Sequence, residues 1–306
     1  MKFSPTEVAF GRHETFHLRF AWLSKGFAQL KENSDLFKKP DEATVTLGVG
    51  KNMVMSIRYW LRAAGLVEEN KDQPTELGAY IFDKDKGVDP FLEDEGTLWL
   101  IHWLIASNAS GATTIAWFFN KYHKGHFDQS ELRAALSNFL QDSVQSNRRA
   151  APATQKNDIS VLIRLYAKTQ NSVIADEALD SPLAELGLIT GHGKTDYQSV
   201  FDDQPGLPSE ILGYALISLF NFRERQQLPV EELVHSKENY VSLGTVFRLT
   251  ESAFMAKLDE LVRVYPQYFT LRDTAGLRQL YLSEQLNPQL MLDAYYGLGA
   301  NLGEAA

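Results

Sequence analysis

Residues 43–67 read ATVTLGVGKNMVMSIRYWLRAAGLV, and glycines interrupt an otherwise helical pattern in this stretch. The apolar spacing predicts a short helix ending near Leu47, a tight turn over Gly48–Gly50, and a second helix running to Ala64. Gly65 is expected to end the second helix, because glycine readily adopts the left-handed conformation found after many helices. The stretch therefore predicts a helix-turn-helix.

The residues that follow complete a recognisable order of elements. Leu66–Glu68 has the composition of a short strand, Asn70–Pro74 that of a turn, and Leu77–Phe82 that of a returning strand or helix. Helix, turn, helix, strand and turn in this order predict a winged helix-turn-helix between about Ala43 and Phe82. Because such modules dock a helix in the major groove, duplex DNA is the expected partner.

The second helix of this module has two chemically different sides. At about 100° per residue, its apolar side collects Gly50, Met53, Val54, Ile57, Leu61 and Ala64. The other side is basic, and Gly48–Val67 contains no acidic residue. Arg and Lys suit phosphates and guanine edges, whereas Asn suits adenine. We therefore expect DNA contacts from Lys51, Asn52, Ser56, Arg58, Tyr59 and Arg62. The alternative is a solvated helix face in a module that binds another protein.

The chain as a whole is acidic, which limits how it meets nucleic acid. Its 306 residues carry a net charge of −9, whereas non-specific coating of nucleic acid needs clustered Lys and Arg. Residues 1–83 hold 11 basic and 11 acidic side chains, so the negative excess lies in the rest of the chain. Local docking on DNA is therefore expected rather than broad coating.

The composition excludes several other classes of protein. The chain contains no cysteine, which excludes disulfides, thiolate nucleophiles and cysteine-based zinc sites. Met1–Pro5 shows no apolar leader, and the longest apolar run, Leu98–Ala106, is too short to span a bilayer. We expect a cytoplasmic protein with no membrane partner.

Beyond the first module, the patterning predicts a mainly α fold with small β wings. We expect a winged helix-turn-helix DNA-binding domain at 1–87, a helical middle domain at 88–226 and a winged-helix-like C-terminal domain at 227–306. In the first two, helices are expected at Phe16–Glu32, Leu92–Ser107, Thr113–Tyr122, Ser130–Asp142, Asn157–Lys168 and Ser209–Glu224. Exposed loops are expected at Ser143–Gln155 and Gly187–Pro208, which are polar or rich in Gly, Asp and Pro.

The C-terminal region also has a winged pattern. Helices are expected at Pro229–Val234 and Thr250–Tyr265, with Thr250 as the N-cap. Strands are expected at Tyr268–Leu271 and Leu277–Leu282, around a turn at 273–276. Residues 228–285 carry six basic and eight acidic side chains. Contact with protein, or packing, is therefore favoured there over a second DNA-reading surface.

His13-Glu14-Thr15-Phe16-His17 matches the H-E-x-x-H pattern of zinc hydrolases. On a helix, this spacing sets two imidazoles one turn apart around a metal, with the glutamate as base for the bound water. A zinc-dependent hydrolase is therefore one alternative function. In the other interpretation, His13 and Glu14 cap a helix that starts near Thr15.

An acidic cluster lies at the start of the first predicted helix of the middle region. Asp89, Glu93 and Asp94 lie where that helix begins, and carboxylates at this position complement the helix dipole. The functional alternative is a divalent-metal site for phosphodiester chemistry that uses Asp89, Glu93 or Asp94 with Mg²⁺ or Mn²⁺.

Three stretches of the sequence together resemble one protein family. They are Gly11–Phe16 with Leu18-Arg19, then Leu47–Leu61, and then Asp89-Pro90 with Leu92–Asp94 and Thr97–Asn108. Weaker similarity at 180–188 and 244–249 extends the resemblance over nearly the whole chain. The sequence resembles domain-of-unknown-function family 4007, which is similar to the B component, a DNA-nicking protein, of Ssp-type bacterial DNA phosphorothioation and anti-phage defence systems.

The resemblance implies a function and a set of partners. It implies that the chain binds DNA and nicks one strand so that sulfur can replace a non-bridging phosphate oxygen. The implied partners are a cysteine desulfurase, an ATPase and a sulfur-transfer enzyme. For the chemistry, the expected residues are His13, Glu14, Arg19, Asp89, Glu93 and Asp94. A non-catalytic DNA-binding adaptor or transcription-type regulator stays as the other alternative function.

Overall fold

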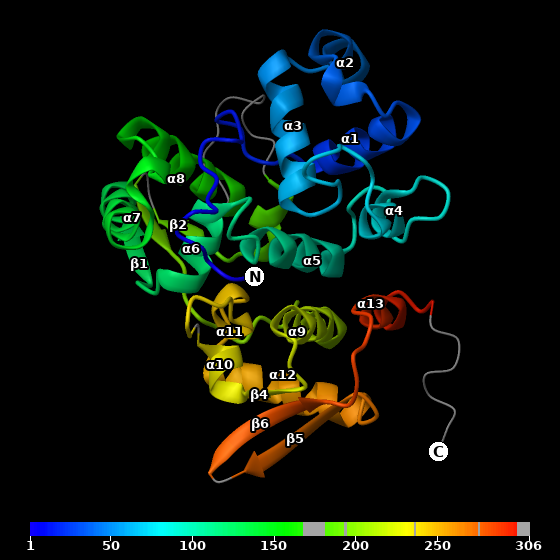
Figure 1. The fold of residues 1–306 in the computed structure, drawn as a ribbon, viewed down its shortest axis with the longest axis vertical. Helices are drawn as coiled ribbons and strands as arrows, with labels where there is room; N and C mark the ends of the chain where they lie inside the picture. Colours follow the sequence, from blue (N-terminus) through cyan, green and yellow to red (C-terminus); the bar gives the residue numbers. More distant parts are fainter. Residues whose placement is uncertain (168–180, 193–194, 236, 275, 299–306) are drawn as a thin grey trace. The chain divides into compact units, whose positions relative to one another are not determined.

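The computed structural model describes residues 1–306 except 168–180, 193–194, 236, 275 and 299–306 (Figure 1). The described residues form two compact units. The N-terminal unit comprises Phe3–Phe118 and Tyr122–Val200. The C-terminal unit comprises Met1–Lys2, Phe119–Lys121 and Phe201–Ala306. Compactness thus gives two units where the sequence predicts three regions, and the division into three functional domains stays a prediction.

The N-terminal unit contains the predicted helix-turn-helix. α2 (Pro40–Leu47) ends at Gly48, whose φ of 61° is left-handed, and α3 (Lys51–Ala63) begins after the extended Gly50. α1 (Phe20–Glu32) packs against α3 and joins α2 through a 3-10 turn, η1 (Leu36–Lys38). Apolar side chains from these helices are almost completely buried, namely Leu23, Phe27, Leu47, Val54, Ile57, Trp60 and Leu61. Their burial stabilises the module by the hydrophobic effect.

α1 begins at Phe20, four residues later than the periodicity predicts. The backbone explains the difference, because residues 16–19 are not helical and Arg19 is extended, with a φ of −115° and a ψ of 153°. Within this segment Leu18 is still fully buried, whereas Phe16 is partly buried.

The expected wing is reduced to one bridge. Val67 pairs with Pro74 as an isolated antiparallel bridge, and the returning segment is a helix, α4 (Glu76–Phe82). The Thr75 hydroxyl caps α4 by accepting from the backbone N–H of Gly78. Gly78 is required here, because a Cβ would lie 2.3 Å from the carbonyl oxygen of Leu66. The strand alternative for 77–82 was wrong, since a capped helix satisfies these backbone groups locally.

Four further helices belong wholly or mainly to the N-terminal unit. They are α5 (Glu95–Ala106), α6 (Thr113–Lys121, of which residues 119–121 group with the C-terminal unit), α7 (Gln129–Ser143) and α8 (Pro152–Tyr166). Nearly every side chain of α5 is buried. α8 starts five residues before its predicted position, because Pro152 occupies the first helical turn, where its missing N–H costs nothing. Short 3-10 turns, η2 (Ser146–Arg148) and η3 (Pro182–Leu186), occupy parts of the connecting segments.

The segment 187–208, predicted as a loop, contains two strands. β2 (Thr190–His192) and β3 (Asp196–Gln198) pair antiparallel, and β1 (His126–Asp128) pairs with the other edge of β3. Each strand is three residues long. Such short strands show no apolar alternation, and this is why the sequence pattern did not reveal them.

The C-terminal unit combines helices with a second three-stranded sheet of order β4-β6-β5. Its elements are α9 (Ser209–Arg223), β4 (Gln227–Pro229), α10 (Val230–Val234), α11 (Leu243–Val246), α12 (Glu251–Val264), β5 (Phe269–Thr274), β6 (Leu277–Leu282) and α13 (Gln289–Tyr295). Thr250 caps α12 as predicted, accepting from the backbone N–H of Ala253. Within the described residues, no helix is both long enough and apolar enough to cross a membrane.

Candidate functional site

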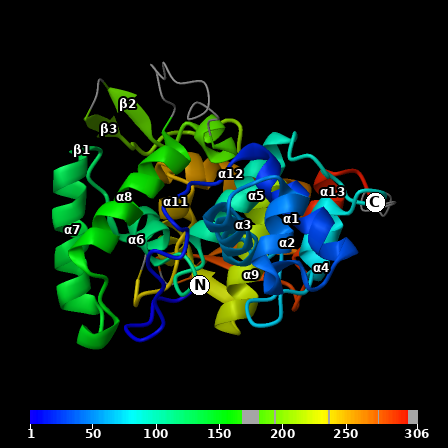
Figure 2. The same cartoon turned by 90° about the horizontal axis from the view of Figure 1, so that it is seen from above.

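An extended strap ahead of α1 (residues 3–19) runs between α3 and the helices α6 and α8 (Figures 1 and 2). Hydrogen bonds hold it on both sides. On one side, the indole Nε1–H of Trp60 donates to the carbonyl oxygen of Phe16 at 3.3 Å. On the other side, the Ala9 N–H donates to the Thr113 hydroxyl at 2.9 Å. The strap is therefore fixed against both helical groups of the N-terminal unit.

A buried carboxylate on α8 anchors the middle of the strap. Asp158 is 4% exposed, and its Oδ1 accepts from the Gly11 N–H and from His13 Nε2, each at 2.9 Å. Its Oδ2 accepts from the Thr114 hydroxyl at 2.8 Å. The N–H of Thr15 donates to His13 Nδ1 at 3.2 Å, which places the imidazole proton on Nε2, facing Asp158. Because both ring nitrogens of His13 are hydrogen-bonded, His13 helps to fix the strap to α8 in this structure.

The anchored turn presents two charged residues. Gly11, Glu14 and Thr15 all have positive φ, and two of these are residues for which that conformation is costly. At Gly11, a Cβ would also lie 3.0 Å from Thr154 Cγ2. The hydrogen bonds to Asp158 hold this strained turn, and the side chains of Arg12 and Glu14 on either side of His13 are exposed.

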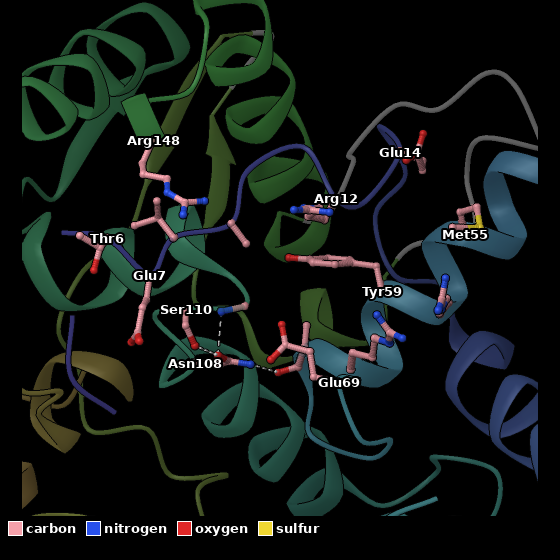
Figure 3. Close-up of a pocket in the computed structure, with 16 residues that line it drawn as sticks. Thr6, Glu7, Arg12, Glu14, Met55, Tyr59, Glu69, Asn108, Ser110 and Arg148 are labelled. Atoms are coloured by element: carbon pink, nitrogen blue, oxygen red, sulfur yellow. Dashed lines mark hydrogen bonds between the residues drawn. The ribbon is translucent and has the colours of Figure 1, made fainter. Parts of the chain in front are cut away.

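Arg12 and Glu14 line a cavity of about 610 Å³. The cavity is bounded by the strap, by α3, by the loop after α3, by the loop after α5, and by η2. Four arginines line it, Arg12, Arg58, Arg62 and Arg148, together with three glutamates, Glu7, Glu14 and Glu69. In Figure 3 the Tyr59 ring extends from α3 into the same cavity. Four guanidinium groups from three segments of an acidic chain therefore meet at one place.

Arg58 and Arg62 share one carboxylate. Arg58 donates from Nε to Asp72 Oδ1 at 3.0 Å and from Nη2 to Oδ2 at 2.7 Å. Arg62 donates from Nε to Asp72 Oδ1 at 2.8 Å, and its Nη2 lies 2.7 Å from the same oxygen. Asp72 belongs to the loop between the bridged residues Val67 and Pro74. The basic side of α3 is thus paired with an acid that lies just beyond the stretch in which the sequence shows none.

Tyr59 carries a neutral phenol. Burial, and then the negative charge of Asp158, raise the pKa of Tyr59 well above its ordinary value. Its ring meets the His13 ring edge to face, with centroids 6.0 Å apart. Tyr59 therefore links the cavity to the anchor and offers a protonated hydroxyl.

The other residues predicted to contact DNA have different positions. Lys51 and Asn52 are exposed at the start of α3, where Lys51 Nζ lies 3.2 Å from Asp41 Oδ1. Ser56 is fully buried, and its hydroxyl donates to the Phe16 carbonyl oxygen at 3.4 Å. Ser56 therefore packs against the strap in this structure, and the prediction that it contacts DNA was wrong. Its position next to the basic stripe suggested exposure, because the pattern of this helix alone does not show that the strap covers Ser56.

The zinc-hydrolase interpretation of His13–His17 was wrong. Residues 13–16 form a turn in which the Phe16 N–H donates to the His13 carbonyl oxygen at 2.9 Å, so the two imidazoles do not lie one helical turn apart. His17 is buried in the extended segment ahead of α1. In the described part of the chain, no group of three or more His, Asp or Glu residues is arranged to hold a metal ion.

The acidic cluster before α5 caps that helix. Asp89 is buried and accepts from the N–H groups of Glu93 and Asp94 at 2.9 and 3.0 Å. Asp94 is the N-cap and accepts from the Thr97 N–H at 3.0 Å. Asp89, Glu93 and Asp94 are not among the residues that line the cavity. Arg19 lies apart from the cavity too, with its guanidinium 5.4 Å from the Trp22 ring centroid.

Of the six residues expected to carry chemistry, Glu14 is thus the one that lines the cavity. Sequence reasoning missed Asp72, Arg148 and Asp158. Arg148 lies in the segment predicted as an exposed loop. Asp158 lies on an amphipathic helix, where a polar residue does not by itself indicate a functional role. Only the folded chain brings these positions to the strap and to α3.

Comparison with known proteins identifies the relatives of this fold. The chain matches the family described as protein of unknown function DUF4007 over residues 10–296. It is similar to a magnesium ion-bound crystal structure of SspB, with 27% sequence identity, coverage of 96% of this chain and 89% of that chain, and a TM-score of 0.83. A second SspB crystal structure matches with the same identity and coverage and a TM-score of 0.81. No curated protein matches the chain. The resemblance predicted from the motifs is confirmed: this chain belongs to the DUF4007 family.

Proposed function

We propose that this protein binds duplex DNA at the arginine-lined cavity beside α3 and nicks one strand. The observation that carries the proposal is the meeting of Arg12, Arg58, Arg62 and Arg148 in one cavity of a chain whose net charge is −9. Guanidinium groups match phosphate oxygens in pairs of parallel hydrogen bonds and stay charged at every physiological pH. A phosphodiester is the anion that best fits several such groups converging from separate segments.

As the second helix of the helix-turn-helix, α3 is the proposed recognition helix, and it extends from an exposed start to the cavity. Lys51 and Asn52 are exposed at the start of α3, and Met55, Arg58, Tyr59 and Arg62 line the cavity further along it. The first residues of a recognition helix usually contact base edges, while neighbouring cationic groups contact the backbone. One helix can therefore read bases at its start and place a phosphate among the arginines.

The chemistry that fits the cavity is attack of water on phosphorus. A P–O bond forms to the water oxygen, the ester bond on the opposite side breaks, and the departing oxygen takes a proton from solvent. Negative charge that builds on the non-bridging oxygens would be stabilised by the arginines. Glu14, exposed on the cavity and in no ion pair with another described residue, is proposed to accept the proton of the attacking water.

One of the similar SspB structures contains a magnesium ion. The described residues of this chain do not assemble a site of three or more protein ligands, and the three cavity glutamates come from separate segments. We therefore assign no step to a metal, and we treat Mg²⁺ and Mn²⁺ as conditions to vary in the assay.

The proposed setting is a phosphorothioate DNA modification and phage-defence system of the Ssp type. Support comes from the likeness to SspB over 96% of the chain and from membership of the DUF4007 family. In this setting the nicked strand would be the substrate on which the partners insert sulfur. These partners are a cysteine desulfurase, an ATPase and a sulfur-transfer enzyme. The protein would act in the cytoplasm, where the DNA is.

Incubation of purified protein with supercoiled plasmid tests the proposal, with Mg²⁺, with Mn²⁺ and with chelator. We expect open-circle product from the wild type, and its loss with Glu14→Gln. Asp142→Asn is the matched control, because Asp142 is an exposed acid on α7 that does not line the cavity. Loss of product with Glu93→Gln but not with Glu14→Gln would show that the catalytic carboxylate lies at the start of α5 and not in the cavity. Duplex binding without open-circle product under every condition would replace the nickase with a DNA-binding adaptor.

A further inference from the structure

The shared carboxylate of Asp72 does more than neutralise two arginines. It meets the Nε and Nη2 sides of both guanidinium groups, as the four contacts between 2.7 and 3.0 Å show. Among the described residues, neither Nη1 group makes a hydrogen bond or ion pair, so each is left for another acceptor. Both side chains also line the cavity.

Burial is distributed unevenly over this triad. The side chain of Asp72 is 5% exposed, while those of Arg58 and Arg62 are 27% and 24% exposed. The carboxylate therefore lies on the inner side of the pair, and the arginines lie between it and solvent. A flexible arginine loses conformational freedom when it binds an anion, and a side chain that is already held loses less.

We propose that Asp72 is a positioning residue that holds Arg58 and Arg62 ready for a phosphate-type anion, with their Nη1 groups presented to the cavity. The inference rests on the proposed function, because it names the groups that would grip the DNA backbone. It assigns the loop between Val67 and Pro74 the task of placing one carboxylate under the recognition helix. The anion is an oxyanion with several acceptor oxygens, such as a phosphodiester.

The loop itself does not depend on this carboxylate. Backbone hydrogen bonds close it, from the Glu68 N–H to the Gln73 carbonyl oxygen at 2.9 Å and from the Thr75 N–H to the Leu66 carbonyl oxygen at 3.0 Å. Asp72 has a φ of 53°, a conformation in which glycine is unstrained. Asp72→Gly therefore removes the carboxylate from a loop whose backbone is suited to the substitution.

Two accounts of Asp72 make opposite predictions for this variant. If Asp72 acts only as a negative charge near an anion site, its removal strengthens anion binding. If it positions the arginines, its removal weakens anion binding, although the protein becomes less negative. We expect Asp72→Gly to weaken binding about tenfold, since preorganisation is lost at two guanidinium groups.

The test uses two probes, a short fluorescein-labelled DNA duplex and inorganic pyrophosphate. Binding of each is measured for the wild type, for Asp72→Gly and for Glu68→Gln. Glu68 is the matched control, because its exposed carboxylate pairs with Lys71 in the same loop and the change removes the same charge. A thermal melt of each variant reports whether the fold is kept, and Asp72→Asn, which suits a positive φ, serves as a second variant if the glycine variant melts early.

The expected result is weaker binding of both probes by Asp72→Gly, with Glu68→Gln unchanged or slightly tighter. In an Arg58→Ala, Arg62→Ala background, Asp72→Gly is expected to have no further effect, which a general loss of stability would not reproduce. Equal or tighter binding of pyrophosphate by a folded Asp72→Gly variant, or no binding of it by the wild type, would overturn the inference. Weaker pyrophosphate binding by the variant, together with no duplex binding by the wild type, would instead leave the arginine pair in place and remove the DNA function.

Discussion

His13 donates its Nε2–H to Asp158 Oδ1 over 2.9 Å, a bond between residues 145 positions apart in the sequence. Both side chains are buried. The bond ties the strap to α8, and Arg12 and Glu14, on either side of His13, are among the strap residues that line the cavity. A histidine that looks catalytic in the sequence is thus held in the interior, and its neighbours carry the exposed charges.

Removal of the anchor should destabilise the fold strongly. Asp158→Ala leaves the His13 imidazole, the Gly11 N–H and the Thr114 hydroxyl without their acceptor, and breaking a buried pair of this kind costs about 3 kcal/mol. Asp158→Asn should cost less, because its amide oxygen still accepts a hydrogen bond. Urea unfolding measures both, with Asp142→Asn expected within about 0.5 kcal/mol of the wild type. Equal stability of Asp158→Ala and wild type would mean that the strap is not anchored this way.

Glycine 11 should resist substitution for two separate reasons. Its φ of 68° is left-handed, and a Cβ there would lie 3.0 Å from Thr154 Cγ2. Gly187 has a φ of 65° with nothing within 4 Å of a built Cβ, so it carries the conformational cost alone. We expect Gly187→Ala to cost about 1 kcal/mol and Gly11→Ala more. Denaturant unfolding of the two variants gives the difference, and a smaller loss for Gly11→Ala would contradict the packing against Thr154.

The helix-turn-helix could be predicted from sequence because its signals are local. Gly65 adopts the left-handed conformation that the pattern predicts, and Gly48, in the predicted turn, adopts it too. By contrast, the apolar spacing predicts a helix that starts at Phe16, yet α1 begins at Phe20. The carbonyl oxygen of Phe16 instead accepts from the Trp60 indole, a tertiary contact that the local pattern does not show. Single-residue bridges and three-residue strands are likewise fixed by their partners, so the sequence around them gives no sign of them.

Arg148 should contribute one phosphate contact. It is exposed and lines the cavity from η2. Arg148→Ala is expected to weaken duplex binding by a similar factor on every sequence and to reduce the slope of log affinity against log salt by about 0.9. Fluorescence anisotropy over a series of salt concentrations measures that slope. Arg133→Ala, on the exposed side of α7 and outside the cavity lining, should leave it unchanged.

Tyr59 should make stability fall at alkaline pH. The folded pKa lies above the unfolded value of 10.0 because burial, and then Asp158, disfavour the phenolate. The folded state therefore keeps a proton that the unfolded chain releases. That contribution is complete below the unfolded pKa and is lost as the pH rises towards the folded pKa. Tyr59→Phe should flatten this fall. Urea unfolding at about pH 8 and about pH 10.5 gives the comparison, and parallel losses for the two proteins would show that the phenol is not shielded.

Only some of the residues that line the cavity could be predicted from the sequence. The basic stripe predicted Arg58 and Arg62, and the His-Glu motif drew attention to Glu14, which does line the cavity. Arg12 lies in a motif of the family resemblance but was not assigned a role, and Arg148 belongs to no motif; both line the cavity because the fold brings the strap and η2 to it. Asp72 could not be predicted for another reason. It lies five residues beyond Val67, where the stretch without acids ends, and the loop that carries it folds back to bring its carboxylate to Arg58.

Site-specific photo-crosslinking tests the central claim most directly. Met55 lines the cavity on α3, so p-benzoylphenylalanine at position 55 should crosslink to a bound duplex. The control places the same group at position 222, an exposed site of the C-terminal unit. The account predicts a crosslink from position 55 that Arg148→Ala diminishes, and little from position 222. A crosslink from position 222 with none from position 55 would contradict it.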